Sequence, residues 1–279
     1  MSEQKPERVA KIIARAGLCS RREAERWIAN NRVRVDGKTL QSPAFTVDTS
    51  NFIQVDGKPL PQAQETRLWR YHKPTGLVTS HADPQGRPTV FERLSPTIGR
   101  VISIGRLDLN SEGLLLLTND GELARRLEMP STEWIRRYRV RVRGNVDQSK
   151  LEKLQNGVAV SGIKYKAIRA SLDSETRTNA WLTVALTEGK NREIRKIMEY
   201  LDLKVNRLIR LSYGPFELGK LERNQVNEVP NKILHAHVTE NKRRVLGKFR
   251  GAGWAKAKKS LKPMRTMKKS NLNSEKTKK

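Results

Sequence analysis

The sequence predicts an α+β protein with a small basic module followed by a larger domain. The first 60 residues contain two short helix patterns and then strands that end in Asp-Gly turns. Residues 68 to 229 contain several strand patterns separated by short, capped helix patterns. A length of 279 residues accommodates two domains and a tail. We therefore expect a module over 6–60, a linker over 61–67, a larger domain over 68–240 and a tail over 241–279.

Positive charge dominates the composition, because the formal net charge is +27. The last 39 residues contain 15 Lys or Arg and a single Glu, with few apolar residues. Such a segment buries too little apolar surface to fold by itself, and we expect a disordered basic tail. A field of this size indicates a polyanionic partner. Nucleic acid is favoured over a membrane, because no basic amphipathic helix with a strong apolar face is present.

Several classes of protein are excluded by what the sequence lacks. No apolar run reaches membrane-spanning length, and the first residues do not contain a signal-peptide core. The single Cys19 excludes an internal disulfide framework and any multi-cysteine zinc site. The pair His235 and His237 is too small a set to indicate a metal site. We expect a cytoplasmic protein without a bound metal.

The first module is predicted from helix signals and turns. Val9, Ile12 and Ile13 recur at helical spacing before Gly17, and Ser20-Arg21-Arg22-Glu23 forms a capping box for a second helix. Two later strands each enter an Asp-Gly hairpin, at 36–37 and 56–57.

Arginines gather at the start of the second helix and on the first hairpin. These candidate phosphate contacts are Arg21, Arg22, Arg26 and Arg34, with Arg32 beside them. A solvated helix face is the alternative explanation. The run from Arg8 to Glu25, continued by Val33 to Gly37, resembles the RNA-binding domain named after ribosomal protein S4.

The larger domain is predicted to alternate strands with short helices. Strands are expected at 68–73, 77–80, 101–105, 114–117, 136–143, within 158–170, at 180–186 and at 205–213. Short helices are expected near 89–94, 121–128, 151–154 and 193–198.

One strand pattern places arginines on a single side. In residues 136–143, Tyr138 shares a side with Val140 and Val142, while four arginines point to the other side. Arginines so close together repel each other unless they are solvated or face phosphate. Core packing and a role in the functional site remain equal alternatives for Tyr138.

A short loop between two predicted strands carries the candidate catalytic residue. Asp108 lies in Gly105-Arg106-Leu107-Asp108, just before the apolar run from Leu114 to Leu117. A loop held between core strands is rigid, and an aspartate among leucines must be paired, hydrogen-bonded or reactive. A turn aspartate that caps the following residues is the alternative.

The larger domain resembles the RsuA-like family of rRNA pseudouridine synthases. The phrases that carry the resemblance are Tyr71-His72-Lys73-Pro74-x-Gly76, Gly105 to Asp108 with Ser111 to Gly121, Tyr138, and Gly189 to Arg195. The resemblance implies a mixed, mostly antiparallel sheet with flanking helices and a central cleft. It also implies a monomer that acts on RNA without a metal or nucleotide cofactor. Residues 83–94 are most similar to the branch that acts on 23S rRNA, naked or in a precursor of the large subunit.

The resemblance also implies roles for individual residues. Asp108 is the implied catalytic aspartate, Tyr138 stacks on the target base, and Arg195 pairs with Asp108. Arg87, Arg106 and Arg192 are the candidate RNA contacts of this domain. A single carboxylate suffices to isomerise uridine, whereas a hydrolytic glycosidase normally needs two. We therefore assign Glu112 to structure.

Two other functions remain open from the sequence. A non-catalytic RNA-binding protein of ribosome assembly would share the basic surfaces without requiring Asp108. An RNA-directed glycosidase would release free uracil.

Overall fold

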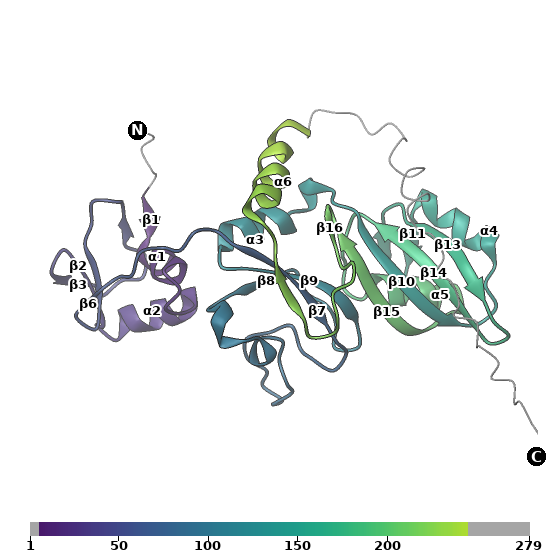
Figure 1. Ribbon diagram of the computed structural model, residues 1–279, viewed down its shortest axis with the longest axis horizontal. Helices are drawn as coiled ribbons and strands as arrows, with labels where there is room; N and C mark the ends of the chain where they lie inside the picture. The colour runs from purple at the N-terminus through teal and green to yellow at the C-terminus, as the bar shows by residue number, and fades with distance from the viewer. Residues whose placement is uncertain (1–5, 245–279) are drawn as a thin grey trace, which may run out of the picture. The chain divides into compact units, whose positions relative to one another are not determined.

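The computed structural model describes the backbone of residues 6–244 and the side chains up to residue 237 (Figure 1). Most of the predicted tail over 241–279 lies outside this range. The first module contains helices α1 (Val9–Arg15) and α2 (Arg21–Ala29) beside a four-stranded sheet of order β3-β2-β5-β6. Its strands are β2 (Val33–Val35), β3 (Lys38–Thr39), β5 (Ile53–Val55) and β6 (Lys58–Pro59), and a separate pair joins β1 (Glu7–Arg8) to β4 (Thr46–Val47).

The Ser20 cap and both Asp-Gly turns of the first module form as predicted. The Ser20 hydroxyl accepts the Glu23 backbone N–H at 3.0 Å, which caps α2. The Glu23 carboxylate accepts a hydrogen bond from the Trp27 indole N–H at 3.1 Å. It therefore does not bond back to the Ser20 backbone N–H, as the glutamate of a capping box would. Both Asp-Gly turns have positive φ at their two central residues, as a type I′ hairpin requires. One apolar cluster from Val9 to Val55 forms the core.

The larger domain is built on one nine-stranded mixed sheet of order β13-β14-β10-β15-β9-β7-β17, with β8 paired to β9 and β16 paired to β15. Only β9 and β15 run parallel, and the other pairs are antiparallel. The strands are β7 (Leu68–Lys73), β8 (Ile102–Ile104), β9 (Glu112–Thr118), β10 (Arg136–Arg143), β13 (Arg169–Glu175), β14 (Asn179–Leu186), β15 (Lys204–Tyr213), β16 (Phe216–Glu217) and β17 (Val226–Glu228). A small hairpin joins β11 (Val158–Val160) to β12 (Ile163–Tyr165).

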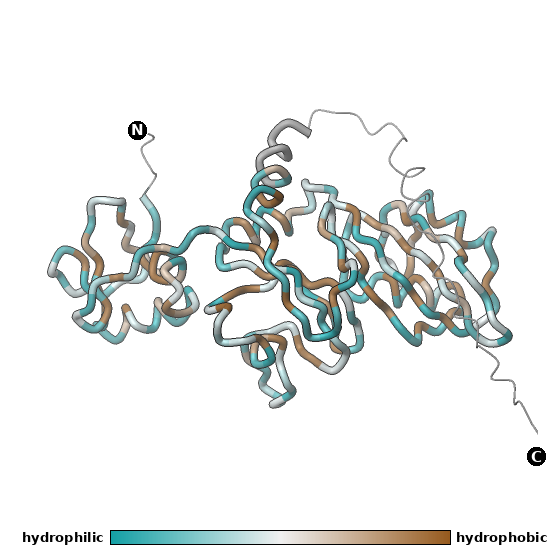
Figure 2. The backbone as a smooth tube through the Cα atoms, in the orientation of Figure 1, coloured by the Kyte–Doolittle hydropathy of each residue, from teal (hydrophilic) through white to brown (hydrophobic). Residues whose placement is uncertain are grey.

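Helices cover parts of this sheet. The α-helices are α3 (Gly121–Glu128), α4 (Gln148–Lys153), α5 (Glu193–Tyr200) and α6 (Asn231–Arg244), and the 3-10 turns are η1 (Phe91–Arg93), η2 (Pro96–Ile98), η3 (Pro130–Thr132) and η4 (Leu154–Asn156). Residues of α4 and α5 pack with Tyr138, Val140 and Val142 in one buried cluster. A second cluster joins α3 to Leu114 and Leu116, and a third joins Leu107 to Leu115 and Leu117. Figure 2 shows the hydrophobic residues concentrated along the strands.

The structure confirms the predicted α+β class and the mixed, mostly antiparallel sheet. The strand expected at 77–80 is wrong, since Val78 forms only an isolated bridge with Thr89. The Thr79 hydroxyl there bonds to the Leu107 carbonyl, so the segment supports a loop. The helix expected over 89–94 is reduced to η1. Helix α6 was not expected, because its sequence has little amphipathic pattern.

Candidate active site

The loop between β8 and β9 holds Asp108 on a backbone that is fixed at several points. The Ser111 N–H donates to the Asp108 carbonyl at 3.0 Å, which closes a turn. The Thr79 hydroxyl donates to the Leu107 carbonyl at 2.9 Å, and the Leu107 side chain is buried. These bonds leave the Asp108 carboxylate 36 % exposed on a rigid support. The Asp108 carboxylate is therefore not enclosed in this structure, whereas the neighbouring Leu107 side chain is buried.

Lys73, at the end of β7, is the residue that fixes this loop most directly. Its side chain is fully buried, and its Nζ donates to the carbonyls of Pro74 at 3.0 Å, Asp108 at 3.1 Å and Ser111 at 2.9 Å. Burial lowers the pKa of Lys73 to about 8, against the opposing charges of Asp108 and Glu112. Lys73 has no role among the predictions made from the sequence. The signal that could have found it is its place on the same side of the strand as Trp69 and Tyr71, where a buried lysine needs hydrogen-bond partners.

The guanidinium closest to Asp108 belongs to Arg192. Its Nη1 lies 3.6 Å from Asp108 Oδ2. Arg192 occupies the N-cap position of α5 in a left-handed conformation, with φ of 51°, and its side chain makes no capping hydrogen bond. Half of its side chain is exposed, so this ion pair contributes about 0–1 kcal/mol and can be exchanged for another anion.

Arg195 forms no ion pair with Asp108 among the described residues, contrary to the prediction; its partners are backbone carbonyls. Arg195 donates to the carbonyls of Asn110 at 2.8 Å and Val205 at 3.2 Å, with one bond from each of its two terminal nitrogens. Burial, and then the charge of Arg192, lowers the pKa of Arg195, while Asp108 opposes that shift. Arg195 is thus close enough to Asp108 to feel its charge, and it anchors the end of the Asp108 loop to β15.

The segment that enters α5 is ordered by a buried carboxyl group. Glu193 Oε2 accepts the Lys190 backbone N–H at 2.8 Å. Burial raises the pKa of Glu193 to about 7, and the neighbouring carboxylate of Glu188 adds to that shift. Glu193 is not among the site residues predicted from the sequence. Its position before Ile194, on the buried side of α5, was the available signal.

Tyr138 lies on β10, on the side of the sheet that α5 covers. It is 8 % exposed and lies opposite Arg210 of β15, which in turn lies opposite Gly113 of β9. With neighbouring strands about 4.8 Å apart, β10 and β9 are about 10 Å from each other. Its hydroxyl has no hydrogen-bond partner among residues 6–237. Tyr138 is therefore both a core residue and a candidate base contact, so the two alternatives do not exclude each other.

Glu112 is a structural residue, as the sequence analysis assigned it. Its carboxylate is 3 % exposed and is paired with Arg207, and with Arg223 at 3.2 Å. Burial raises its pKa, but these arginines outweigh that effect and hold the pKa below its ordinary value. Glu112 opens β9 on the side of the sheet opposite Gly113 and Tyr138.

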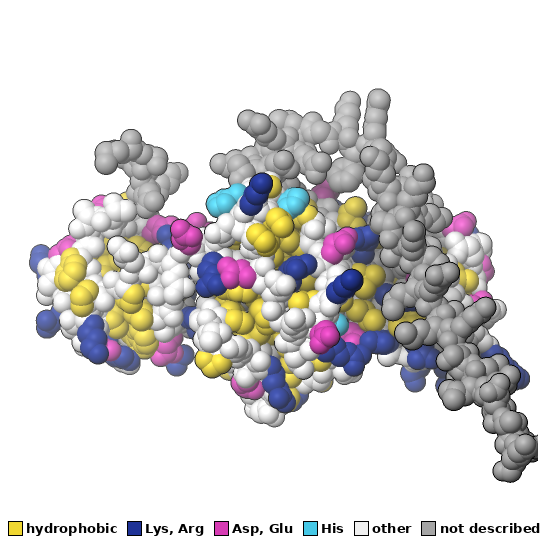
Figure 3. Space-filling view, viewed as in Figure 1, with side chains coloured by type: hydrophobic (Ala, Val, Ile, Leu, Met, Phe, Trp, Pro, Cys, Tyr) yellow, Lys and Arg dark blue, Asp and Glu magenta, His cyan; other side chains and the backbone are white. Residues whose placement is uncertain are grey.

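The arginines predicted to contact RNA differ in whether they pair with an acidic side chain. Among the described residues, Arg21, Arg22, Arg34 and Arg106 have exposed side chains and no acidic partner. Arg26 pairs with Glu23, and Arg87 forms a two-pronged pair with Asp83 at 2.7 and 2.9 Å. Figure 3 shows lysine and arginine side chains spread over the visible face of the described residues.

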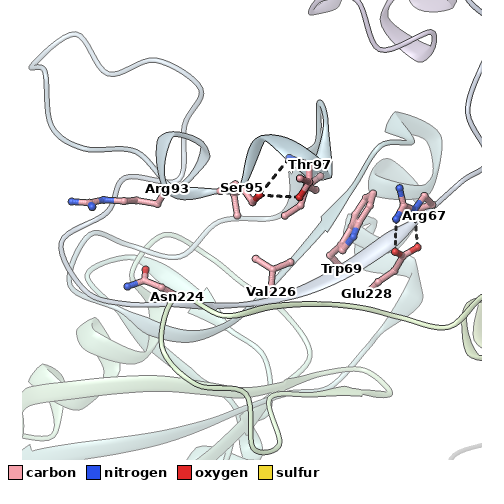
Figure 4. Close-up of a pocket in the computed structure, with 10 residues that line it drawn as sticks. Arg67, Trp69, Arg93, Ser95, Thr97, Asn224, Val226 and Glu228 are labelled. Carbon is pink, nitrogen blue, oxygen red and sulfur yellow. Dashed lines mark hydrogen bonds and ion pairs between the residues drawn. The ribbon is translucent and has the colours of Figure 1, made fainter.

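A cavity of about 560 Å³ lies apart from these residues. It is bounded by η1, η2 and β17, and Figure 4 shows Trp69 and the Arg67–Glu228 ion pair along its wall. It includes none of the predicted site residues. This cavity is thus separate from the loop of Asp108.

Comparisons with known proteins agree with this architecture. Residues 67–200 match the model of RNA pseudouridylate synthases, and residues 7–53 match the S4 domain. An RNA pseudouridine synthase of Rickettsia typhi is 52 % identical over 227 residues, covering 81 % of this chain and 93 % of the relative. Ribosomal large subunit pseudouridine synthase B of Yersinia pestis is 44 % identical, covering 77 % of this chain and 69 % of the relative. A crystal structure of a pseudouridylate synthase shares the fold, with a TM-score of 0.57 and 24 % identity over 82 % of this chain and 98 % of that one.

The fold and the two family matches define an RNA pseudouridylate synthase domain that follows an S4 domain. The chain belongs to the RNA pseudouridine synthase family, whose members are isomerases. The resemblance drawn from the sequence is confirmed, as is its likeness to large subunit pseudouridine synthase B. No helix of the described residues is long and apolar enough to cross a membrane.

Proposed function

We propose that this enzyme isomerises a specific uridine of 23S rRNA to pseudouridine, with Asp108 as the catalytic residue. The observation that carries the proposal is the Asp108 loop, whose backbone is fixed by Lys73 while its carboxylate stays accessible. The likeness to a large subunit synthase supports the choice of rRNA. The bacterial relatives support a cytoplasmic reaction, and naked 23S rRNA or a precursor particle is the proposed substrate.

The reaction needs a carboxylate that can approach the ribose. The bond from uracil N1 to ribose C1′ breaks, the uracil rotates, and C5 forms the new bond to C1′ before it loses its proton. Asp108 starts this sequence as a nucleophile or a base at the ribose. Every atom of the uridine is retained and no net electron is transferred, which supports a reaction without metal or nucleotide cofactor.

Neighbouring residues support the chemistry through position and charge. Tyr138 provides an aromatic surface for a base that has left its stack, an event that costs a few kcal/mol. Arg192 exchanges its weak pair with Asp108 for a phosphate of the bound RNA. Arg195 holds the loop through Asn110 and adds positive charge beside the carboxylate. We propose that the protein acts as a monomer.

The first module adds affinity rather than chemistry. Arg21, Arg22 and Arg34 are exposed cations on one small fold, and Arg26 lies on the same helix. In the larger domain, Arg87 and Arg106 extend the basic surface. Contacts of this kind bind phosphate and lose strength as the salt concentration rises.

Replacing Asp108 with Asn tests the assignment directly. The purified wild type should form pseudouridine in a 23S rRNA transcript, as read by chemical mapping, and D108N should form none because its amide is neither nucleophile nor base. The backbone bonds of residue 108 persist in D108N, so it should still bind RNA and unfold at the same temperature. E199Q, an exposed change on α5, is the control and should retain full activity.

Product formation by D108N would refute the catalytic assignment. RNA binding by the wild type without any pseudouridine would favour a non-catalytic assembly protein. Release of free uracil would identify a glycosidase.

A further inference from the structure

Among the described residues, helices cover one half of the large sheet on one side only. Tyr138, Val140 and Val142 of β10 pack against α4 and α5. On the opposite side of β10, the side chains of Arg139, Arg141 and Arg143 are exposed. We call this side the arginine face, formed by Arg139, Arg141, Arg143, Trp181, Lys204 and Arg207.

The register of the strands sets positive charges opposite each other on this face. Arg141 lies opposite Arg207, and Arg143 lies opposite Lys204. Like charges directly across a strand pair are destabilising. Arg207 is neutralised by Glu112, but Arg141 and Arg143 have no acidic partner among the described residues. A face arranged in this way is suited to an anionic partner.

An aromatic side chain lies within the same set of charges. Trp181 of β14 is half-buried and lies opposite Arg141, and the guanidinium carbon of Arg139 is 4.7 Å from the centre of its ring. Arginine and tryptophan together can contact phosphates and stack on exposed bases. The arginines of β10 are two residues apart, so their spacing is about 6.8 Å along the strand. This regular row suits a polymer with evenly spaced negative charges.

The active site lies on the other side of the sheet. Helix α5, which packs on the Tyr138 side, places Arg192 beside Asp108 and Arg195 beside Asn110. RNA bound at Asp108 therefore cannot cover the arginine face with the same segment.

We infer that the arginine face is a second RNA-binding surface, which holds the phosphate backbone of an rRNA segment distinct from the one that carries the target uridine. This inference rests on the proposed function, because it assigns the enzyme an extended rRNA substrate. It predicts that a long rRNA binds more tightly, and with a steeper salt dependence, than a short stem-loop around the target.

The test compares two RNAs and two double variants. The probes are a full 23S rRNA transcript and a short stem-loop that contains the uridine mapped with the wild type. R141Q/R143Q removes two unpaired charges from the arginine face. R125Q/R126Q removes two exposed charges from α3 and is the matched control. Thermal unfolding checks that both variants fold as the wild type does.

R141Q/R143Q should weaken binding of the 23S transcript roughly tenfold, because it lowers the slope of log K against log salt by about 1.5. Binding and modification of the stem-loop should stay within about twofold of the wild type. R125Q/R126Q should leave the difference between the two RNAs unchanged.

Two results would overturn the inference. They are an unchanged affinity for the transcript and an equal loss on both RNAs. The absence of pseudouridine with the wild type would refute the proposed function instead, while the binding comparison would still decide the role of this face.

Discussion

At the scale of single residues, the site depends on charged groups whose backbone partners matter as much as their charges. Lys73 and Arg195 both donate to carbonyls around the Asp108 loop. Each is a cation with several donors, and carbonyls near a buried loop need such donors. Among the residues that the structure describes, only Arg192 is an ion-pair partner of Asp108. The surrounding cations thus act mainly by holding the loop in one conformation.

Replacing Lys73 with Met should separate loop position from RNA binding. Met is similar in length but donates no hydrogen bonds, so the carbonyls of Asp108 and Ser111 lose a buried donor. We expect a loss of about 3 kcal/mol in the free energy of unfolding, measured with urea. At a temperature where the variant is folded, kcat should fall while KM for rRNA stays near the wild-type value. K153M, an exposed change on α4, should alter neither. An unchanged kcat would contradict this positioning role.

Glu193 should make stability depend on pH. Its folded pKa is raised to about 7 by burial, so the folded chain keeps a proton that the unfolded chain releases near its ordinary pKa of 4.5. The contribution of Glu193 is therefore present below about pH 4.5 and is lost as the pH rises through about 7. E193Q stays neutral, and its stability relative to the wild type should increase between pH 5 and pH 8. Urea unfolding at each pH measures this, and E199Q is the exposed control. A difference that does not change with pH would refute the assignment.

At the scale of elements, the decisive contact is the parallel pairing of β9 with β15. Gly113 lies opposite Arg210, with φ of 102°, and a Cβ there would be 2.4 Å from the Arg210 carbonyl oxygen. No side chain fits between the two strands at this point. The strand β9 begins at the end of the Asp108 loop, and β15 pairs with the strand of Tyr138. This contact therefore sets the separation of Asp108 and Tyr138.

Replacing Gly113 with Ala should therefore disturb both stability and catalysis. The clash is with backbone and φ is unfavourable, so we expect a loss of at least about 3 kcal/mol in urea unfolding. Activity should fall further than the folded fraction, because β9 must move away from β15. Gly105→Ala is the matched control: φ is +67° and no atom lies within 4 Å of the added Cβ, so it should cost only about 1–2 kcal/mol. Equal effects of the two changes would contradict this account.

At the scale of the whole molecule, excess positive charge is distributed over several surfaces rather than concentrated at one site. Free cations lie on the first module, near the Asp108 loop and on the arginine face. A net charge of +27 opposes folding by self-repulsion, and binding of polyanionic RNA relieves that repulsion. The distribution suits an enzyme that surrounds its target with many weak phosphate contacts, and it makes affinity sensitive to salt.

The sequence alone determined most of the helices and strands, both Asp-Gly hairpins, the aspartate loop and the family. These features depend on residues close together in the chain, such as Ser20 with Glu23 or the leucines that follow Asp108. Only the tertiary structure decided that Arg192 pairs with Asp108, that Lys73 fixes its loop, and that an arginine-lined side of the sheet is uncovered. Those results depend on strand register and on donors from distant segments, because a buried donor bonds to whichever acceptor the fold brings within reach.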